Sequence, residues 1–181
     1  MQKLAVFLAS LLISISSHSQ TSINVVGSDD NVAISSFDAV AFFTQKEAVT
    51  GKSEFSHTHL GAKWLFSSAD NLKAFQASPE KFVPEWGGQC ALCVSENCVS
   101  EKKLSGDFAL VDGKLYLFAY GNRSKSGPKD TFLYGRWSRA ARVGDGEKSW
   151  PGLKAKLEDG TLVQPNSKNY RRTTFEGSAR Q

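Results

Sequence analysis

The residues of this 181-residue chain best suited to chemistry are three cysteines that follow a glycine pair. They occur as Cys90-Ala-Leu-Cys93-Val-Ser-Glu-Asn-Cys98. Two histidines, His57 and His59, are spaced so that both would point from the same face of a β-strand. Three thiolates and one imidazole complete a tetrahedral set for zinc, and soft sulfur ligands also suit Cu(I). These five residues are therefore the candidate metal ligands, with zinc or copper as the candidate cofactor.

The same cysteines have other interpretations, which the sequence leaves open. Oxidising conditions outside the cytosol favour a disulfide, and Cys93–Cys98 is the pair expected to form it. Because three is an odd number, one bridge would leave a free thiol, and Cys90 is the candidate. Nothing in the sequence shows that the histidines approach the cysteines. A buried thiol that acts only as a small apolar side chain is therefore a further alternative.

A cysteine nucleophile needs a thiol of lowered pKa and a base within hydrogen-bond reach. Cys90 could use His57 or His59, but no carboxylate is evidently placed to orient the imidazole, and no known cysteine-hydrolase pattern surrounds it. Cys90-Ala-Leu-Cys93 has the spacing of a thiol-exchange motif without the βαβ context of a thioredoxin-like site. A non-catalytic role is therefore favoured over a thiol-dependent enzyme, and no catalytic residue is assigned.

The N-terminus has the three parts of a secretory signal peptide. Lys3 supplies positive charge, residues 4–15 are an apolar run of twelve, and residues 16–19 are short and small-rich. This run is shorter than the roughly 20 residues that span a bilayer. We expect residues 1–20 to be removed and the protein to be exported, to the periplasm or as a secreted protein. After cleavage, no later segment has the length of a transmembrane helix.

The remaining chain has the size of one domain with its own core. We expect this domain to span residues 21–157 and a loose basic tail to span 158–181. The formal net charge of +4 is modest, which argues against a dedicated nucleic-acid binder. Four tryptophans could line an aromatic ligand pocket, although their spacing among other apolar residues favours a place in the core.

Two hairpins are the elements expected to position the candidate residues. The first covers residues 54–66, with a turn at Gly61-Ala62, and carries both histidines. The second covers residues 108–120 and has the preferred two-residue turn Asp112-Gly113.

Helical signals lie between and after the hairpins. Ser68 is placed to cap a helix that Pro79 ends. A further helix is expected over residues 131–143, followed by a short element over 147–157. Hairpins and short helices without a regular βαβ alternation predict a small single domain of the α+β class.

Seven short segments occur in a recognisable order over residues 36–153. They are Phe37-Asp-Ala-Val-Ala-Phe-Phe43, Gly61-Ala-Lys-Trp-Leu-Phe-Ser-Ser68, Phe75, Pro79-Glu-Lys-Phe82, Gly87-Gly-Gln-Cys-Ala91, Asp112-Gly-Lys-Leu-Tyr-Leu117 and Trp150-Pro-Gly-Leu153. In this order they resemble the exported branch of the YHS domain family. The resemblance implies a YHS-like domain of β-hairpins packed with short helices.

The resemblance also implies where the short, metal-associated form of this family binds a metal. The cysteines of that form fall at Ala41, Ser67 and Asn71 in this chain. Methyl, hydroxyl and amide groups are poor ligands for zinc or copper, so we expect that metal site to be lost.

The loop from Gly87 to Cys98 is then the expected site of any chemistry. The expected function is that of an exported YHS-like binding or accessory protein that binds a metal ion or a small ligand near this loop. The alternative is a structural or interaction protein in which a disulfide staples the loop.

Overall fold

The computed structural model describes residues 31–100, 104–119 and 140–162. Its helices and strands, in chain order, are η1 (Ile34–Ser36), α1 (Ala41–Thr44), β1 (Lys52–His59), β2 (Ala62–Phe66), α2 (Ala69–Ala77), η2 (Pro79–Lys81), η3 (Glu85–Gly88), α3 (Ala91–Ser95), β3 (Leu104–Val111), β4 (Lys114–Ala119) and α5 (Ala140–Glu158). Two antiparallel hairpins combined with short helices confirm a small α+β fold. The predicted signal peptide lies outside the described residues, as does the tail beyond residue 162.

The first hairpin pairs β1 with β2, in a register that places His59 opposite Ala62. Its two connecting residues, Leu60 and Gly61, have φ values of 50° and 73°. Such left-handed values at both positions are those of the tight turn that suits the twist of paired strands. The hairpin is confirmed, but its turn comes one residue before the predicted Gly61-Ala62.

Helix α2 begins where its capping residue predicts. The Ser68 hydroxyl accepts a hydrogen bond from the backbone N–H of Asn71 at 3.2 Å, and Asp70 lies in the first turn. Both features stabilise the exposed N–H groups and the positive end of a helix. The helix ends at Ala77, and Pro79 begins the separate turn η2, so this prediction is confirmed.

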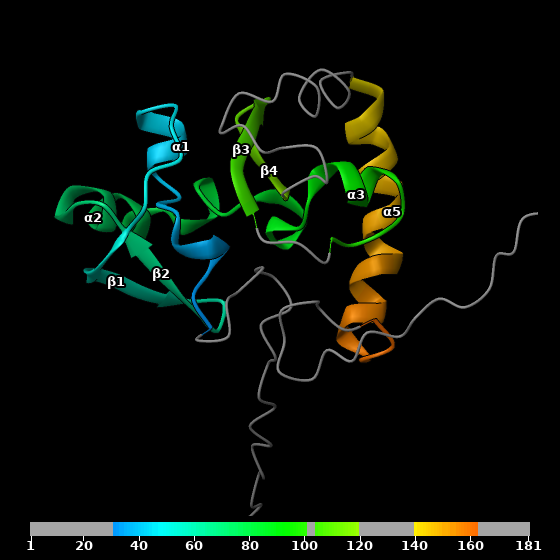
Figure 1. Ribbon diagram of the computed structural model, residues 1–181, viewed down its shortest axis with the longest axis horizontal. Helices are drawn as coiled ribbons and strands as arrows, with labels where there is room; N and C mark the ends of the chain where they lie inside the picture. Colours follow the sequence, from blue (N-terminus) through cyan, green and yellow to red (C-terminus); the bar gives the residue numbers. More distant parts are fainter. Residues whose placement is uncertain (1–30, 101–103, 120–139, 163–181) are drawn as a thin grey trace, which may run out of the picture.

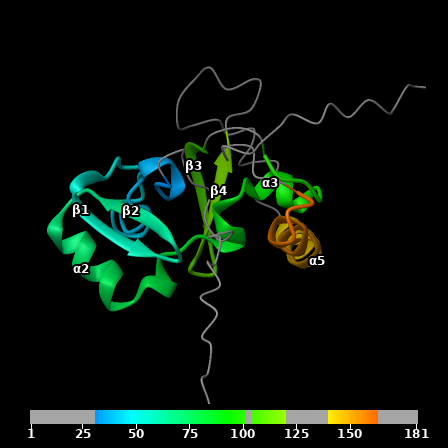
Figure 2. The same ribbon diagram turned by 90° about the horizontal axis from the view of Figure 1, so that it is seen from below.

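The second hairpin, β3–β4, turns at Asp112-Gly113 as predicted, with φ values of 51° and 76°. In both views it lies between the β1–β2–α2 part of the molecule and the α3–α5 part (Figures 1 and 2). Strand β4 is apolar on both faces because each face meets a different part of the core. Leu115 and Leu117 point to one side, and Tyr116 and Phe118 to the other, as strand alternation requires.

The core therefore has two clusters, which share the second hairpin. The first core cluster consists of Ala33, Ile34, Ala39, Val40, Phe42, Ala62, Trp64, Phe66, Phe75, Phe82, Leu104, Leu115 and Leu117. The second core cluster consists of Trp86, Cys90, Ala91, Leu92, Val94, Ala109, Tyr116, Phe118, Ala119 and Leu153. The candidate cysteines belong to the second cluster or border it.

Helix α5 differs from the sequence prediction. A helix over residues 131–143 and a separate element over 147–157 were expected, but one helix runs from Ala140 to Glu158, through Gly146 and Pro151. Gly146 is buried against the ring of Trp86, so a residue that weakens a helix in isolation here permits close packing. Leu153 on the same helix is buried in the second core cluster. Tertiary packing therefore overrides local propensity.

Residues 131–139 of that predicted helix lie outside the described ranges. In the part of the chain that the structure describes, no helix combines the length and the hydrophobicity needed to cross a bilayer.

Candidate functional site

A left-handed turn leads the chain into the cysteines. Trp86, Gly87 and Gly88 have φ values of 52°, 63° and 70°, and all three are buried. Glycine adopts such values without strain, whereas they are uncommon for other residues. A Cβ atom on Gly88 would also lie 3.2 Å from Cγ2 of Ile34. Both glycines therefore suit the path of the chain, and Gly88 also permits its close packing.

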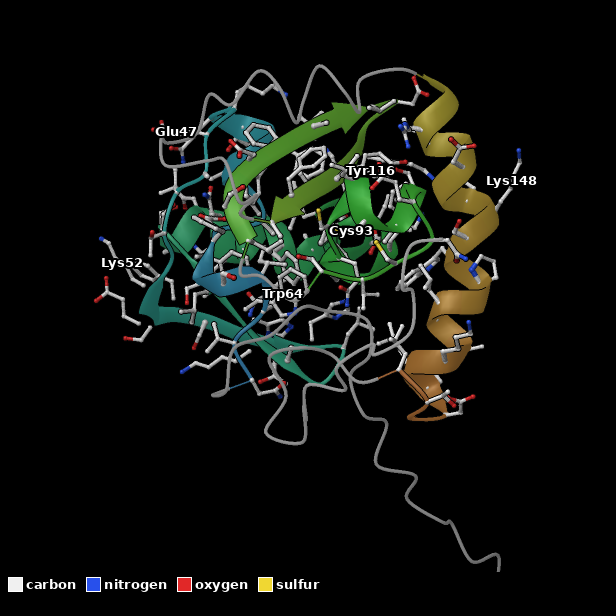
Figure 3. The ribbon with its side chains drawn as sticks, turned by 45° about the vertical axis from the view of Figure 1, so that its right-hand side comes forward. Glu47, Lys52, Trp64, Cys93, Tyr116 and Lys148 are labelled. Carbon is white, nitrogen blue, oxygen red and sulfur yellow. The ribbon has the colours of Figure 1, made fainter. Side chains whose placement is uncertain are left out.

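The three cysteines lie around the short helix α3. Cys90 directly precedes the helix and forms a parallel bridge with Leu117 of β4. Cys93 is one turn further along, where Figure 3 labels it. Cys98 follows the helix, and both its backbone N–H and its thiol donate to the carbonyl oxygen of Cys93, at 2.9 and 3.2 Å. The solvent exposure of the cysteines increases along the chain: Cys90 is buried, Cys93 is half-buried and Cys98 is exposed.

The sulfur atoms interact with one another, and this separates their pKa values. The Cys93 thiol donates a hydrogen bond to the Cys90 sulfur, which lowers the pKa of Cys90 from 9.0 to about 6. Burial opposes this shift, and the backbone N–H of Ala119 adds to it. Because ionisation of Cys93 would remove the donated proton, the hydrogen bond raises the pKa of Cys93. Burial raises the pKa of Cys98 as well.

The two histidines lie against the first core cluster. Both rings contact Phe75, with centroids 6.3 Å away for His57 and 5.6 Å for His59. The prediction that they share one face of a strand is confirmed. Burial, followed by the neighbouring His57, lowers the pKa of His59, while the carboxylate of Glu80 opposes the shift. Because this lowering starts from an ordinary pKa of 6.5, His59 is mainly neutral at pH 7.

The structure thus brings the cysteines together, while the recorded ring contacts of both histidines are with the first core cluster. Across residues 31–100, 104–119 and 140–162, no group of three or more His, Cys, Asp or Glu side chains is arranged to hold a metal ion. All three thiols are free in this structure. The zinc or copper set of Cys90, Cys93, Cys98, His57 and His59 and the Cys93–Cys98 disulfide stay predictions.

A cavity of about 370 Å³ opens beside the start of the Gly87 to Cys98 loop. It is lined by His59, Leu60, Glu80, Val83, Pro84, Glu85, Trp86, Gly87 and Trp150. Its volume is within the range of small-molecule sites, roughly 300–1,000 Å³. The lining combines two indole rings with two carboxylates, so the cavity offers both apolar surface and negative charge.

The two residues with charged side chains that line this cavity, Glu80 and Glu85, are both acidic. Glu85 pairs with Lys114 at 3.4 Å, whereas His59 carries little compensating charge at pH 7. Burial and then the carboxylates of Glu85, Glu147 and Asp112 raise the pKa of nearby Tyr116 to about 12. An excess of carboxylates favours a cationic ligand over an anionic one.

Sequence reasoning considered Trp86 and Trp150 as pocket residues and favoured the core. In the structure Trp86 does both, because it packs against Tyr116 with ring centroids 4.9 Å apart and also lines the cavity. The cavity draws on four separate elements, β1, η2, η3 and α5. Of the lining residues on these elements, only Glu85, Trp86 and Gly87 are consecutive in the sequence, so only they could have pointed to the cavity in advance.

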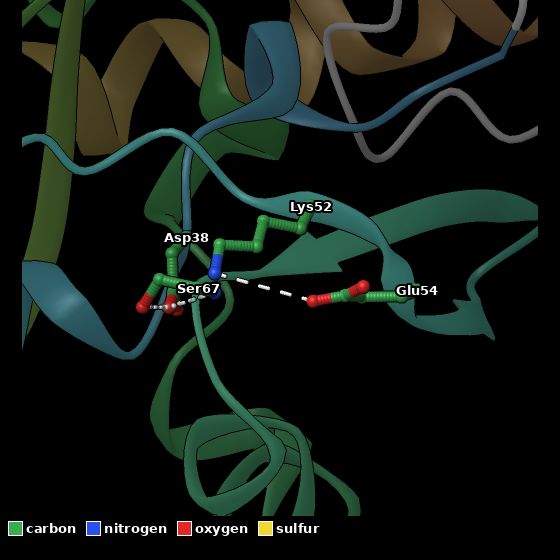
Figure 4. Close-up of polar contacts among 4 residues, drawn as sticks. All are labelled: Asp38, Lys52, Glu54 and Ser67. Carbon is green, nitrogen blue, oxygen red and sulfur yellow. Dashed lines mark hydrogen bonds and ion pairs between the residues drawn. The ribbon is translucent and has the colours of Figure 1, made fainter.

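A second polar centre, around Asp38, was missed as a group. The Asp38 side chain is fully buried, and Figure 4 shows its contact with Ser67. One carboxylate oxygen accepts the backbone N–H groups of Val40 and Ala41 at 2.9 and 3.3 Å. The other accepts the Ser67 N–H at 2.8 Å, the Ser67 hydroxyl at 2.7 Å and the Asn71 amide at 2.7 Å.

In the resemblance to the YHS family, which stays a prediction, the cysteines of the metal-associated form fall at Ala41, Ser67 and Asn71. The structure brings all three to the Asp38 carboxylate. Their hydrogen bonds join the start of α1 to the junction of β2 with α2. This centre therefore connects the elements of the first core cluster. In the sequence, only the presence of two polar residues four positions apart, Ser67 and Asn71, pointed to it.

Comparisons with known proteins give no further guidance, because no family model, curated protein or solved structure matches this chain.

Proposed function

We propose that this protein is an exported, non-catalytic binding protein of the YHS-like type, and that it binds a small organic cation in the cavity beside Gly87. The single observation that carries the proposal is the lining of the cavity, in which Trp86 and Trp150 accompany Glu80 and Glu85. Of the two ligands expected for this loop, a metal ion or a small molecule, the shape and lining of the cavity favour the small molecule.

Indole rings and carboxylates attract the same kind of ligand. A cation over the face of a tryptophan is stabilised by about 0.5–1 kcal/mol at an exposed site, and by more when water is excluded. Glu80 adds Coulombic attraction, although solvent screens it because the residue is exposed. A compact, methylated ammonium group satisfies both features because it is positively charged and has an apolar surface.

Calorimetric titration of the exported protein with choline, and with its neutral isostere 3,3-dimethylbutan-1-ol, tests this proposal. The two compounds have nearly the same shape, so any difference in affinity reports the charge. We expect saturable binding of choline and much weaker binding of the alcohol. Equal affinities, or no saturable binding of either compound, would refute a cation site and favour the structural alternative.

A charge-neutralising pair of variants locates the binding. Glu80→Gln removes a carboxylate from the cavity wall, and we expect it to weaken choline binding by about two- to fivefold. Glu54→Gln is the matched control, because Glu54 is exposed on β1 and only loosely paired with Lys52 at 4.0 Å (Figure 4). An equal loss of affinity in both variants would indicate attraction by overall charge rather than by the cavity.

A further inference from the structure

Cys93 occupies the central position among the three sulfurs. Its sulfur interacts with that of Cys90 and with that of Cys98, and the Cys98 thiol donates to the Cys93 carbonyl oxygen at 3.2 Å. Sulfurs at hydrogen-bond separation need only modest side-chain movement to reach the roughly 2.05 Å of a disulfide bond. Cys93 can therefore bond to either neighbour, but not to both at once.

Exposure of the three thiols decreases along the same series. Cys98 is exposed, Cys93 is half-buried, and Cys90 is only 6% exposed within the second core cluster. A reagent in solution therefore meets Cys98 first. Cys90 is shielded from direct attack, and it contacts the sulfur that Cys98 also contacts.

From this arrangement we propose that Cys90, Cys93 and Cys98 form a thiol–disulfide exchange site in which Cys93 is the shared partner. Its co-substrate is an external disulfide, either of a small thiol such as glutathione or of another protein. The exchange oxidises the protein's own thiols once per external disulfide and turns over no further substrate, so it is compatible with a non-catalytic binding protein, and neither proposal depends on the other.

The exchange consists of balanced steps. The Cys98 thiolate attacks the external disulfide, forms a mixed disulfide and releases one thiol. Cys93 then attacks the Cys98 sulfur, forms Cys93–Cys98 and releases the second thiol. Two protein thiols are oxidised, one external disulfide is reduced to two thiols, and these carry away both protons. Finally the Cys90 thiolate attacks Cys93 to form Cys90–Cys93 and regenerates the Cys98 thiol, with no net oxidation.

A permanent staple between Cys93 and Cys98 is the competing interpretation, and Cys98→Ser separates the two. The reduced full-length chain and its variants are incubated with glutathione disulfide, quenched with acid, and analysed by intact mass and peptide mapping. If the cysteines form an exchange site, the Cys98→Ser variant still forms the Cys90–Cys93 disulfide. We expect this to be several-fold slower, because glutathione disulfide must then react with the half-buried Cys93. If Cys93–Cys98 is instead a permanent structural disulfide, the variant forms no disulfide. Because Cys98 is exposed, the substitution should leave the fold intact, which circular dichroism checks.

The reciprocal variant tests the central position of Cys93. We expect Cys93→Ser to retain glutathione on Cys98, because no neighbouring thiol can resolve the mixed disulfide, whereas the wild-type protein ends with a bridge and no glutathione. A Cys90–Cys98 bridge in Cys93→Ser would overturn the proposal. So would a Cys98→Ser protein that stays reduced or holds glutathione on Cys93. If Cys93→Ser fails to fold, the Cys98→Ser result decides alone.

Discussion

Each core cluster lies beside a polar centre, and the two centres are built in opposite ways. In the first cluster, Asp38 accepts five hydrogen bonds, and all of its donors are fixed by backbone or by short side chains. In the second, the sulfurs of Cys90, Cys93 and Cys98 hydrogen-bond mainly to one another and to nearby backbone.

This difference determines what each centre can do. A carboxylate with a complete set of donors is stabilised in one arrangement, and any rearrangement would leave a buried polar group without a partner. Sulfur forms weak hydrogen bonds and can exchange them for a covalent bond to a neighbour. The Asp38 centre therefore stabilises the fold, whereas the cysteine cluster is suited to chemistry.

The largest expected effect comes from removing the carboxylate of the first centre. Asp38→Ala would leave five donors around a fully buried cavity without their acceptor, and we expect the free energy of unfolding to fall by about 3–5 kcal/mol. Urea denaturation measures this change.

Asp70→Ala is the matched control, since Asp70 is an exposed carboxylate in the first turn of α2. Its contribution to the helix dipole is about 0.3–1 kcal/mol. If the two alanine variants lose similar stability, the Asp38 network does not hold the first cluster together.

An intermediate effect is expected where α5 packs on the second cluster. A Cβ atom on Gly146 would clash with Cη2 and Cζ2 of the Trp86 ring and lie 2.9 Å from its Cζ3, whereas one on Gly144 would meet nothing within 4 Å. We therefore expect Gly146→Ala to destabilise the protein by about 1–3 kcal/mol, because the ring must move. Gly144→Ala should instead stabilise it by about 0.5–1 kcal/mol, because alanine favours a helix. Thermal denaturation of the pair checks the opposite signs, and a shift in the same direction would contradict this packing.

Local signals made much of the scaffold predictable. The Asp112-Gly113 turn and the Ser68 cap each depend on contacts within a few residues of sequence. The short sequence around each one is therefore enough to predict the hairpin turn and the start of the helix. The shared face of His57 and His59 follows directly from strand alternation.

The features that escaped prediction depend on distant contacts. Asp38 meets Ser67 and Asn71 across 29 and 33 residues of sequence, and no local pattern encodes that meeting. The continuous α5 helix depends on Trp86, which fits against Gly146. For the cysteines, the sequence indicated proximity but not their order, in which Cys93 is central.

The effect expected to disturb the fold least concerns the ionisation of Cys90, and it tests the hydrogen bond between the sulfurs directly. Because the pKa of Cys90 is lowered from 9.0 to about 6, its thiolate should form as the pH rises through about 6 and be the main form at neutral pH. Ultraviolet thiolate absorbance of reduced Cys98→Ser protein measures this titration without the exposed thiol. Adding Cys93→Ala removes the largest cause of the shift, so the midpoint should move toward 9.0, and each unit of that movement corresponds to about 1.4 kcal/mol. If the midpoint already lies near 9.0 with Cys93 present, or stays near 6 without it, then Cys93 does not donate to Cys90. The contrast between a fixed carboxylate centre and a coupled sulfur centre would then fail.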